Sequence, residues 1–116
     1  ASAQARHGAV LVGRARFEEI ARGQISGRAR GLLKMVATAD GREVLGVQVA
    51  GDGATELVHV GQAGLLGGLG VDDYVDAVFN FPTMAEAYRV AALDIVRQRR
   101  RGMAPAAPVA ALASAV

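Results

Sequence analysis

The stretch from 32 to 50, LLKMVATADGREVLGVQVA, contains two short apolar segments joined by a turn signal. In Leu32–Ala37 and in Val44–Ala50, successive side chains form two alternating sets, which is the period of a β-strand. Asp40-Gly41 lies between them and predicts a tight turn, because glycine accepts the positive φ that such turns need. Antiparallel neighbours joined by so short a connection argue against a βαβ unit. The segment therefore predicts a β-hairpin.

The residues before the hairpin predict one further strand, at Ala9–Phe17. Its first and last apolar residues alternate in opposite phases, so Gly13 between them is interpreted as a β-bulge that absorbs the slip. Ala1–His7 is interpreted as the end of a helix, and Glu18–Gly27 as mixed and turn-like.

The residues after the hairpin predict a helix from about 54 to 66. Asp52 or Gly53 can cap its start, and the glycines at 67, 68 and 70 end it. Small residues on its apolar stripe allow another backbone to approach closely; the stripe consists of Leu57, Val60, Gly61 and Gly64. A short helical turn is expected at Val71–Val75.

The stretch Phe79–Arg89, FNFPTMAEAYR, introduces the last helix. Thr83 and Glu86 have the spacing of a capping box, in which the threonine hydroxyl accepts from the amide of Glu86 and the glutamate reaches back. One side of the predicted helix is formed by Met84, Tyr88, Ala91 and Ile95. The helix is expected to end at the arginines at 97 and 99–101, where cations favour the negative end of the helix dipole and a solvated helix end is expected.

These elements predict an α+β domain, with an antiparallel sheet and helices packed on it. The domain is expected to occupy residues 1–102. Residues 103–116 are rich in alanine and proline and are interpreted as a tail that is poorly ordered or needs a partner. The chain starts with Ala1 and not Met, which fits a fragment or a processed product.

Composition excludes several classes of protein. Hydrophobic residues make up 52% of the 116 residues, which is enough for a core. Without the four late arginines, the 13 basic residues fall to 9, against 11 acidic residues, so a basic face for nucleic acid is not expected. The chain has no cysteine, which excludes disulfides and thiolate metal sites within it. Neither a secretory signal nor a membrane-spanning run is visible, and a cytoplasmic location is expected.

Potential ligand-binding patterns are weak. The glycines from Gly64 to Gly70 do not form G-x-G-x-x-G, so no FAD or NAD(P) fold is expected here. His7 and His59 are isolated and have no zinc-ligand spacing, so no metal is expected. Lys34, the only lysine, lies in a predicted strand and not in a P-loop.

Residues from about 12 to 93 carry a resemblance to a known family, and the FNFPTMAEAYRVAAL stretch carries most of it. The further matching segments are Gly13–Phe17, Ala21–Gln24, Leu45–Val47 and Glu56–Ala63. The chain resembles the C-terminal dimerisation domain of the class I pyridine nucleotide-disulfide oxidoreductases, and most closely their soluble pyridine nucleotide transhydrogenase branch. The resemblance implies a homodimer and a larger parent enzyme with upstream FAD- and NAD(P)-binding domains. It implies that the 116-residue chain alone holds no cofactor and is not active.

The resemblance also implies roles for the Pro82 segment, which in the family reaches the partner subunit's flavin. The main chain of Phe81 and Pro82 is expected to face that FAD in the parent, with a cis bond between them. The implied interface residues are Phe79, Asn80, Phe81, Pro82, Thr83, Glu86, Tyr88 and Arg89.

Phe81 departs from the disulfide-reductase pattern. The family places an acid/base histidine immediately before the proline, and phenylalanine cannot transfer a proton. Glu86, which would orient that histidine, is retained and is interpreted as a helix cap, so no catalytic residue is assigned. The resemblance thus implies hydride transfer between NADH and NADP through a flavin.

Two alternatives remain open. The same domain could come from a dihydrolipoamide dehydrogenase-like or mercuric reductase-like flavoprotein, or the chain could be a free-standing protein-interaction module.

Overall fold

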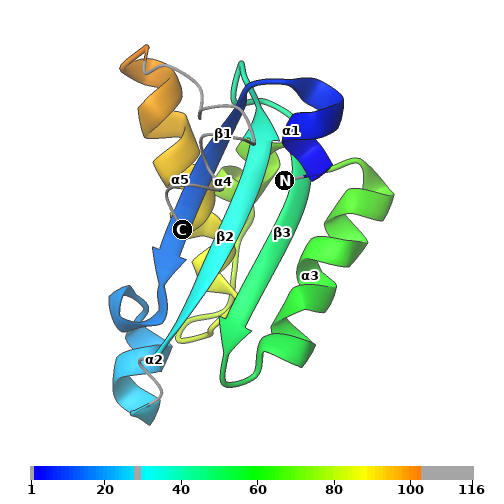
Figure 1. The fold of residues 1–116 in the computed structure, drawn as a ribbon. Coiled ribbons are helices and arrows are strands. Elements are labelled where there is room, and N and C mark those ends of the chain that lie inside the picture. Colours follow the sequence, from blue (N-terminus) through cyan, green and yellow to red (C-terminus); the bar gives the residue numbers. More distant parts are fainter. Residues whose placement is uncertain (1, 28–29, 103–116) are drawn as a thin grey trace.

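The computed structural model describes residues 2–27 and 30–102 as an α+β domain (Figure 1). Residues 103–116, the predicted tail, lie outside the described ranges. In chain order the elements are α1 (Ser2–His7), β1 (Val10–Arg16), η1 (Phe17–Glu19), α2 (Ala21–Ser26), β2 (Gly31–Thr38), β3 (Val44–Gly51), α3 (Ala54–Gly67), α4 (Val71–Asp76) and α5 (Glu86–Arg100). The predicted fold class is confirmed.

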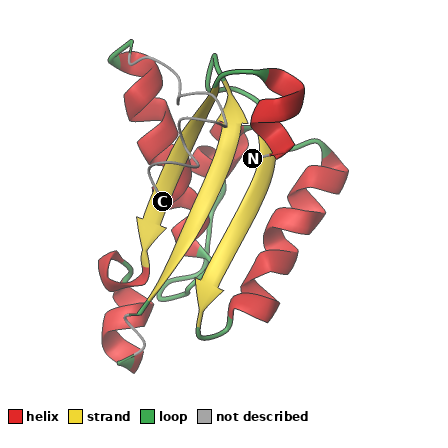
Figure 2. Ribbon diagram, viewed as in Figure 1, coloured by secondary structure: helices red, strands yellow, loops and turns green. Residues whose placement is uncertain are grey.

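The three strands form an antiparallel sheet in the order β1-β2-β3 (Figure 2). The predicted hairpin is confirmed, with Gly41 at φ 70° in its turn. The Asp40 carboxylate accepts from the Thr38 hydroxyl at 2.6 Å and from the backbone N–H of Arg42 at 3.1 Å. The aspartate therefore ties both sides of the turn together.

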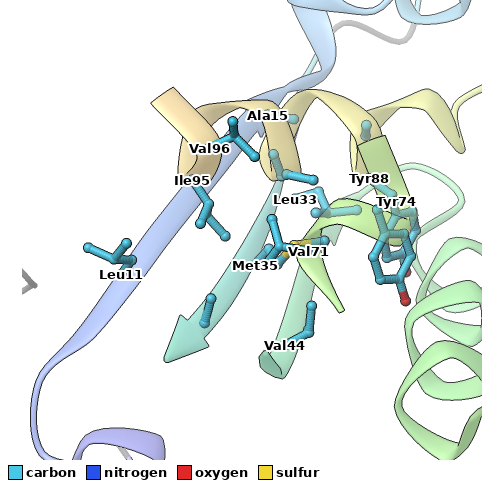
Figure 3. Close-up of a cluster of buried hydrophobic side chains, with 14 of the residues drawn as sticks. Leu11, Ala15, Leu33, Met35, Val44, Val71, Tyr74, Tyr88, Ile95 and Val96 are labelled. Atoms are coloured by element: carbon cyan, nitrogen blue, oxygen red, sulfur yellow. The ribbon is translucent and has the colours of Figure 1, made fainter. Parts of the chain in front are cut away.

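The helices are distributed unevenly around the sheet. Helices α4 and α5 lie behind the sheet in the view of Figure 1, α3 runs beside β3, and α1 lies over one end of the front face. The core fills the space between the sheet and α4 and α5 (Figure 3), and its largest fully buried side chains are Tyr88, Phe17, Leu11, Ile20, Leu33, Met35, Ile95 and Val71.

The expected bulge at Gly13 is wrong. The β1–β2 register runs without a shift from Val10 opposite Thr38 to Arg16 opposite Leu32. Gly13 lies instead directly under α5, where a Cβ would overlap the carbonyl oxygen of Ala91. The glycine therefore lets the helix backbone approach the strand. Within the described strands, the register shifts between Val36 and Ala37.

The predicted stripe of α3 is confirmed for Leu57, Gly61 and Gly64, and tyrosine rings take the space that the glycines leave. The N–H of Gly61 donates to the Tyr88 hydroxyl at 2.9 Å, and that hydroxyl donates to the carbonyl of Leu57 at 2.6 Å. A Cβ on Gly64 would overlap the hydroxyl of Tyr74. The two tyrosine rings stack with centroids 5.5 Å apart.

The segment expected to be turn-like, 18–27, is more regular than its sequence suggests. It contains the end of η1 and all of α2, which ends at Gly27 with φ 69°. The Gln24 side chain donates to the carbonyl of Glu18 at 2.7 Å and closes the segment on itself. Helices this short carry too few turns to show a periodic apolar stripe.

The expectation of a solvated arginine end on α5 is wrong for Arg99. Its guanidinium binds both carboxylate oxygens of Asp72 in α4, at 2.9 and 3.2 Å, and donates to the carbonyl of Gly41 at 3.0 Å. The Arg99 side chain is only 20% exposed. It joins the end of α5 to α4 and to the hairpin turn.

Candidate functional site

The segment between α4 and α5, residues 77–85, is the candidate segment, and it projects apolar groups into solvent. Val78 is fully exposed and Phe81 is 72% exposed. The Phe81–Pro82 bond is cis, which confirms the prediction. Asn80 and Pro82 are also exposed, whereas Phe79 packs partly against the core.

The predicted capping box is wrong. Helix α5 begins at Glu86, and its N-cap residue is Ala85. The Thr83 hydroxyl accepts from the N–H of Ala85 at 3.2 Å, two residues on, while the N–H of Glu86 donates to the Thr83 carbonyl at 3.4 Å. The threonine therefore stabilises a tight turn before the helix.

Tyr88 is misplaced in the implied interface set. Its side chain has no exposed surface and belongs to the core against α3. Thr83 and Glu86 are half-buried, and Arg89 is exposed on the same helix. The exposed part of the set is therefore Asn80, Phe81, Pro82 and Arg89.

A second group of exposed apolar residues lies on α3 and just after it. Leu66 is 84% exposed, and Val60, Leu65 and Leu69 are each more than a third exposed. The prediction of Val60 in the buried stripe of this helix is wrong, and sequence reasoning missed Leu65, Leu66 and Leu69 because it followed the stripe. The signal was available, since Leu65 and Leu66 fall outside the stripe of Leu57, Gly61 and Gly64.

An open hollow of about 460 Å³ lies where α2, α3 and the turn before α5 meet. Arg22, Asp52 and Glu56 contribute charged groups, and Thr83 and Met84 form the side next to the candidate segment. The hollow therefore adjoins the exposed Phe81–Pro82 segment and extends that surface.

The segment 77–85, AVFNFPTMA, contains no titratable side chain. It can contact another group through its ring and main chain but cannot exchange protons with it. Within the residues that the structure describes, no cluster of three histidine, aspartate or glutamate side chains could hold a metal ion. His59 is exposed, with its Nδ1 3.0 Å from the Gln62 side-chain oxygen. None of the described helices is long and apolar enough to span a bilayer.

Comparison with known proteins agrees with this geometry. The family described as "pyridine nucleotide-disulphide oxidoreductase, dimerisation domain" matches residues 1–92. The chain belongs to this family. The amino-acid sequence is 49% identical over 89 residues to a soluble pyridine nucleotide transhydrogenase of Mycobacterium tuberculosis. The match covers 77% of this chain and 19% of that protein. A protein of the same name from Klebsiella pneumoniae is 46% identical over 86 residues, covering 72% of this chain and 18% of the relative.

A solved structure shares the fold. The HOCl-induced flavoprotein disulfide reductase RclA of Escherichia coli, solved as a Cu(II) complex of a cysteine-to-serine mutant, matches with a TM-score of 0.68 and 21% identity. The match covers 78% of this chain and 20% of that one. The chain thus spans about one fifth of the length of the proteins that it matches.

Proposed function

We propose that this chain is the dimerisation domain of a cytoplasmic FAD-dependent enzyme that transfers hydride between NADH and NADP. The observation that carries the proposal is exposed Phe81 in a segment without titratable groups, at the position where the family resemblance implies a proton-transferring histidine. The identity of almost one half to proteins named transhydrogenases supports it. The flavin and nicotinamide sites would lie in upstream domains of the same polypeptide.

The exposed residues support a role in homodimerisation. Val78 and Phe81 lie in the candidate segment, and Leu65 and Leu66 lie on α3. Apolar groups of this size in contact with water favour association, because fully burying one fully exposed side chain of this kind contributes roughly 1.5–3 kcal/mol before the costs of association. Two copies that cover these residues form the proposed dimer.

Phe81 and Pro82 fit contact with a flavin of the partner subunit. A flavin bound there would supply the hydride-transfer chemistry between two nicotinamides. The described residues would contribute apolar contact and exclusion of water, since segment 77–85 has neither a base nor an acid. A dithiol substrate, by contrast, needs a group that can take up its protons.

The assay uses the polypeptide extended upstream to the length of its relatives. We expect NADPH-dependent reduction of a nicotinamide analogue and little turnover of disulfides. Strong disulfide turnover without nicotinamide exchange would contradict the proposed reaction. Light scattering over a concentration series would test the dimer, and a monomer at high concentration would contradict that part.

A further inference from the structure

Two cations lie side by side on the face of the sheet opposite α4 and α5. Arg14 in β1 and Lys34 in β2 are direct cross-strand partners. Their strand neighbours Ala15, Leu33 and Met35 are buried in the core, so the two cations lie on the other face. Like charges directly opposite each other destabilise an antiparallel pair. Within residues 2–27 and 30–102, neither side chain has an ion pair with a carboxylate.

Apolar and small side chains make up much of the surface around this pair. Leu32 and Val36 flank Lys34 on the same face of β2, and both are half-buried. The face also carries polar groups, because exposed Gln48 of β3 lies directly opposite Lys34. On β3 the residues opposite Val36 and Leu32 are the small Gly46 and Ala50. A surface of this kind can be covered by another surface without large side chains in the way.

The other end of the same sheet face is covered by a helix. Helix α1 packs against β1 there, and Val10 is only 2% exposed. Figure 1 shows no described helix in front of the middle of β1 and β2.

We infer that this face docks the upstream part of the same polypeptide through an apolar surface that places a carboxylate against Arg14 and Lys34. The inference rests on the proposed function, which supplies the upstream domains. About four fifths of the length of the relatives lies outside this chain. A second copy is a poorer occupant, because two such faces in contact would bring four cations together.

Lys34 provides a direct readout because it is the only lysine of the chain. Its acylation rate is measured by mass spectrometry in the 116-residue chain and in the polypeptide extended upstream to the length of its relatives. We expect the rate to fall at least about tenfold in the extended polypeptide, since a docked amine reacts only through local opening. An equal rate in the two would overturn the inference.

A zero-length carbodiimide cross-link identifies the occupant. We expect Lys34 to couple to an upstream aspartate or glutamate of the same molecule. Mixed light and heavy isotope-labelled copies separate this product from a link between two copies. A link to a second copy, or none at Lys34, would contradict the assignment.

Reversing the charge of Lys34 distinguishes docking of the upstream part from a role confined to this domain. In the extended polypeptide, Lys34→Glu should speed proteolytic cleavage between this domain and the upstream part, while the charge-conserving Lys34→Arg should not. In the 116-residue chain, Lys34→Glu should leave Tm unchanged or raise it by up to about 8 °C, because it removes repulsion from Arg14. Unchanged cleavage in the extended Lys34→Glu variant would overturn the docking.

The proposed function and the docking can be refuted by different results. Absence of bound flavin or of nicotinamide exchange in the extended polypeptide would refute the reaction. Protection of Lys34 and its cross-link would then still report docking of the upstream part.

Discussion

Tyr74 of α4 and Tyr88 of α5 stack on each other, and removal of the hydroxyl is expected to have opposite effects at the two sites. Tyr88→Phe removes a buried hydroxyl that accepts from Gly61 at 2.9 Å and donates to Leu57 at 2.6 Å. Each buried hydrogen bond contributes about 1 kcal/mol, but the two backbone groups are a helical i, i+4 pair and can bond to each other. We therefore expect a loss of about 1–2 kcal/mol, or a fall in Tm of roughly 5–10 °C.

Tyr74→Phe is the matched control. The Tyr74 hydroxyl is buried and has no hydrogen-bond partner among the described residues. Its removal relieves an unpaired polar group while the 5.5 Å ring stacking is kept, so stability should not fall and should gain up to about 1 kcal/mol. The chain has no tryptophan, so urea unfolding is followed by far-UV circular dichroism, with the m-value as a check on two-state behaviour. Equal losses for both variants would refute this account of the hydroxyls.

A methyl group on α3 tests the same contact from the other side. A Cβ at position 61 would lie 3.0 Å from the Tyr88 hydroxyl and 3.1 Å from Val47. Gly61→Ala should cost about 1–2 kcal/mol, since crowding outweighs the roughly 1 kcal/mol gain in helix propensity. In the double variant with Tyr88→Phe the costs should not add, because the phenylalanine removes one of the crowded atoms.

Alkaline pH should act through the same two side chains. Burial raises the pKa of Tyr88 and of Tyr74 above that of a free phenol. The folded state therefore retains these protons while the unfolded chain loses them, so stability is present below about pH 10 and is lost as pH rises further. Each phenylalanine variant should show a smaller loss of stability between about pH 9 and 11 than the unmodified chain.

The remaining predictions concern the close contact, the ion pair and the site. Gly13→Ala should cost about 3 kcal/mol or more by urea unfolding, because its Cβ would overlap the fixed carbonyl of Ala91; a loss below about 1 kcal/mol would contradict the contact. Arg99 lowers the pKa of Asp72, so the ion pair contributes stability above about pH 4 that is lost as pH falls. Asp72→Asn should therefore cost up to about 1 kcal/mol at pH 7 and almost nothing at about pH 3, and a pH-independent cost would exclude the pair as the cause. In the extended polypeptide, Phe81→His should retain nicotinamide exchange and add little disulfide turnover, and a loss of exchange would show a more specific role for the ring.

The sequence predicted those elements whose signals are local and periodic. The hairpin follows from alternation on both sides of Asp40-Gly41, and both long helices follow from apolar stripes ended by glycines or arginines. The cis bond before Pro82 was predicted from the family resemblance and not from spacing.

The errors arise where a residue acts through a distant partner. Gly13 looked like a bulge because its neighbours seem out of phase, but its contact is Ala91 on a helix far along the chain. Arg99 looked solvated because Asp72 and Gly41 are brought to it only by folding. Arg14 and Lys34 become neighbours only through the strand register, which alternation alone does not fix.

The family-like stretch 79–89 contains residues that pack within this domain and residues that project into solvent, and the sequence alone does not distinguish them. Tyr88 is retained in the core by two hydrogen bonds to α3, so its presence is explained by this domain alone. Phe81 is 72% exposed beside fully exposed Val78 and adds little apolar burial to the isolated fold. An exposed ring next to proline, in a segment without titratable side chains of its own, contributes only when another surface covers it. Exposure thus divides the family-like stretch into residues that hold α5 in place and residues whose role depends on contact beyond this chain.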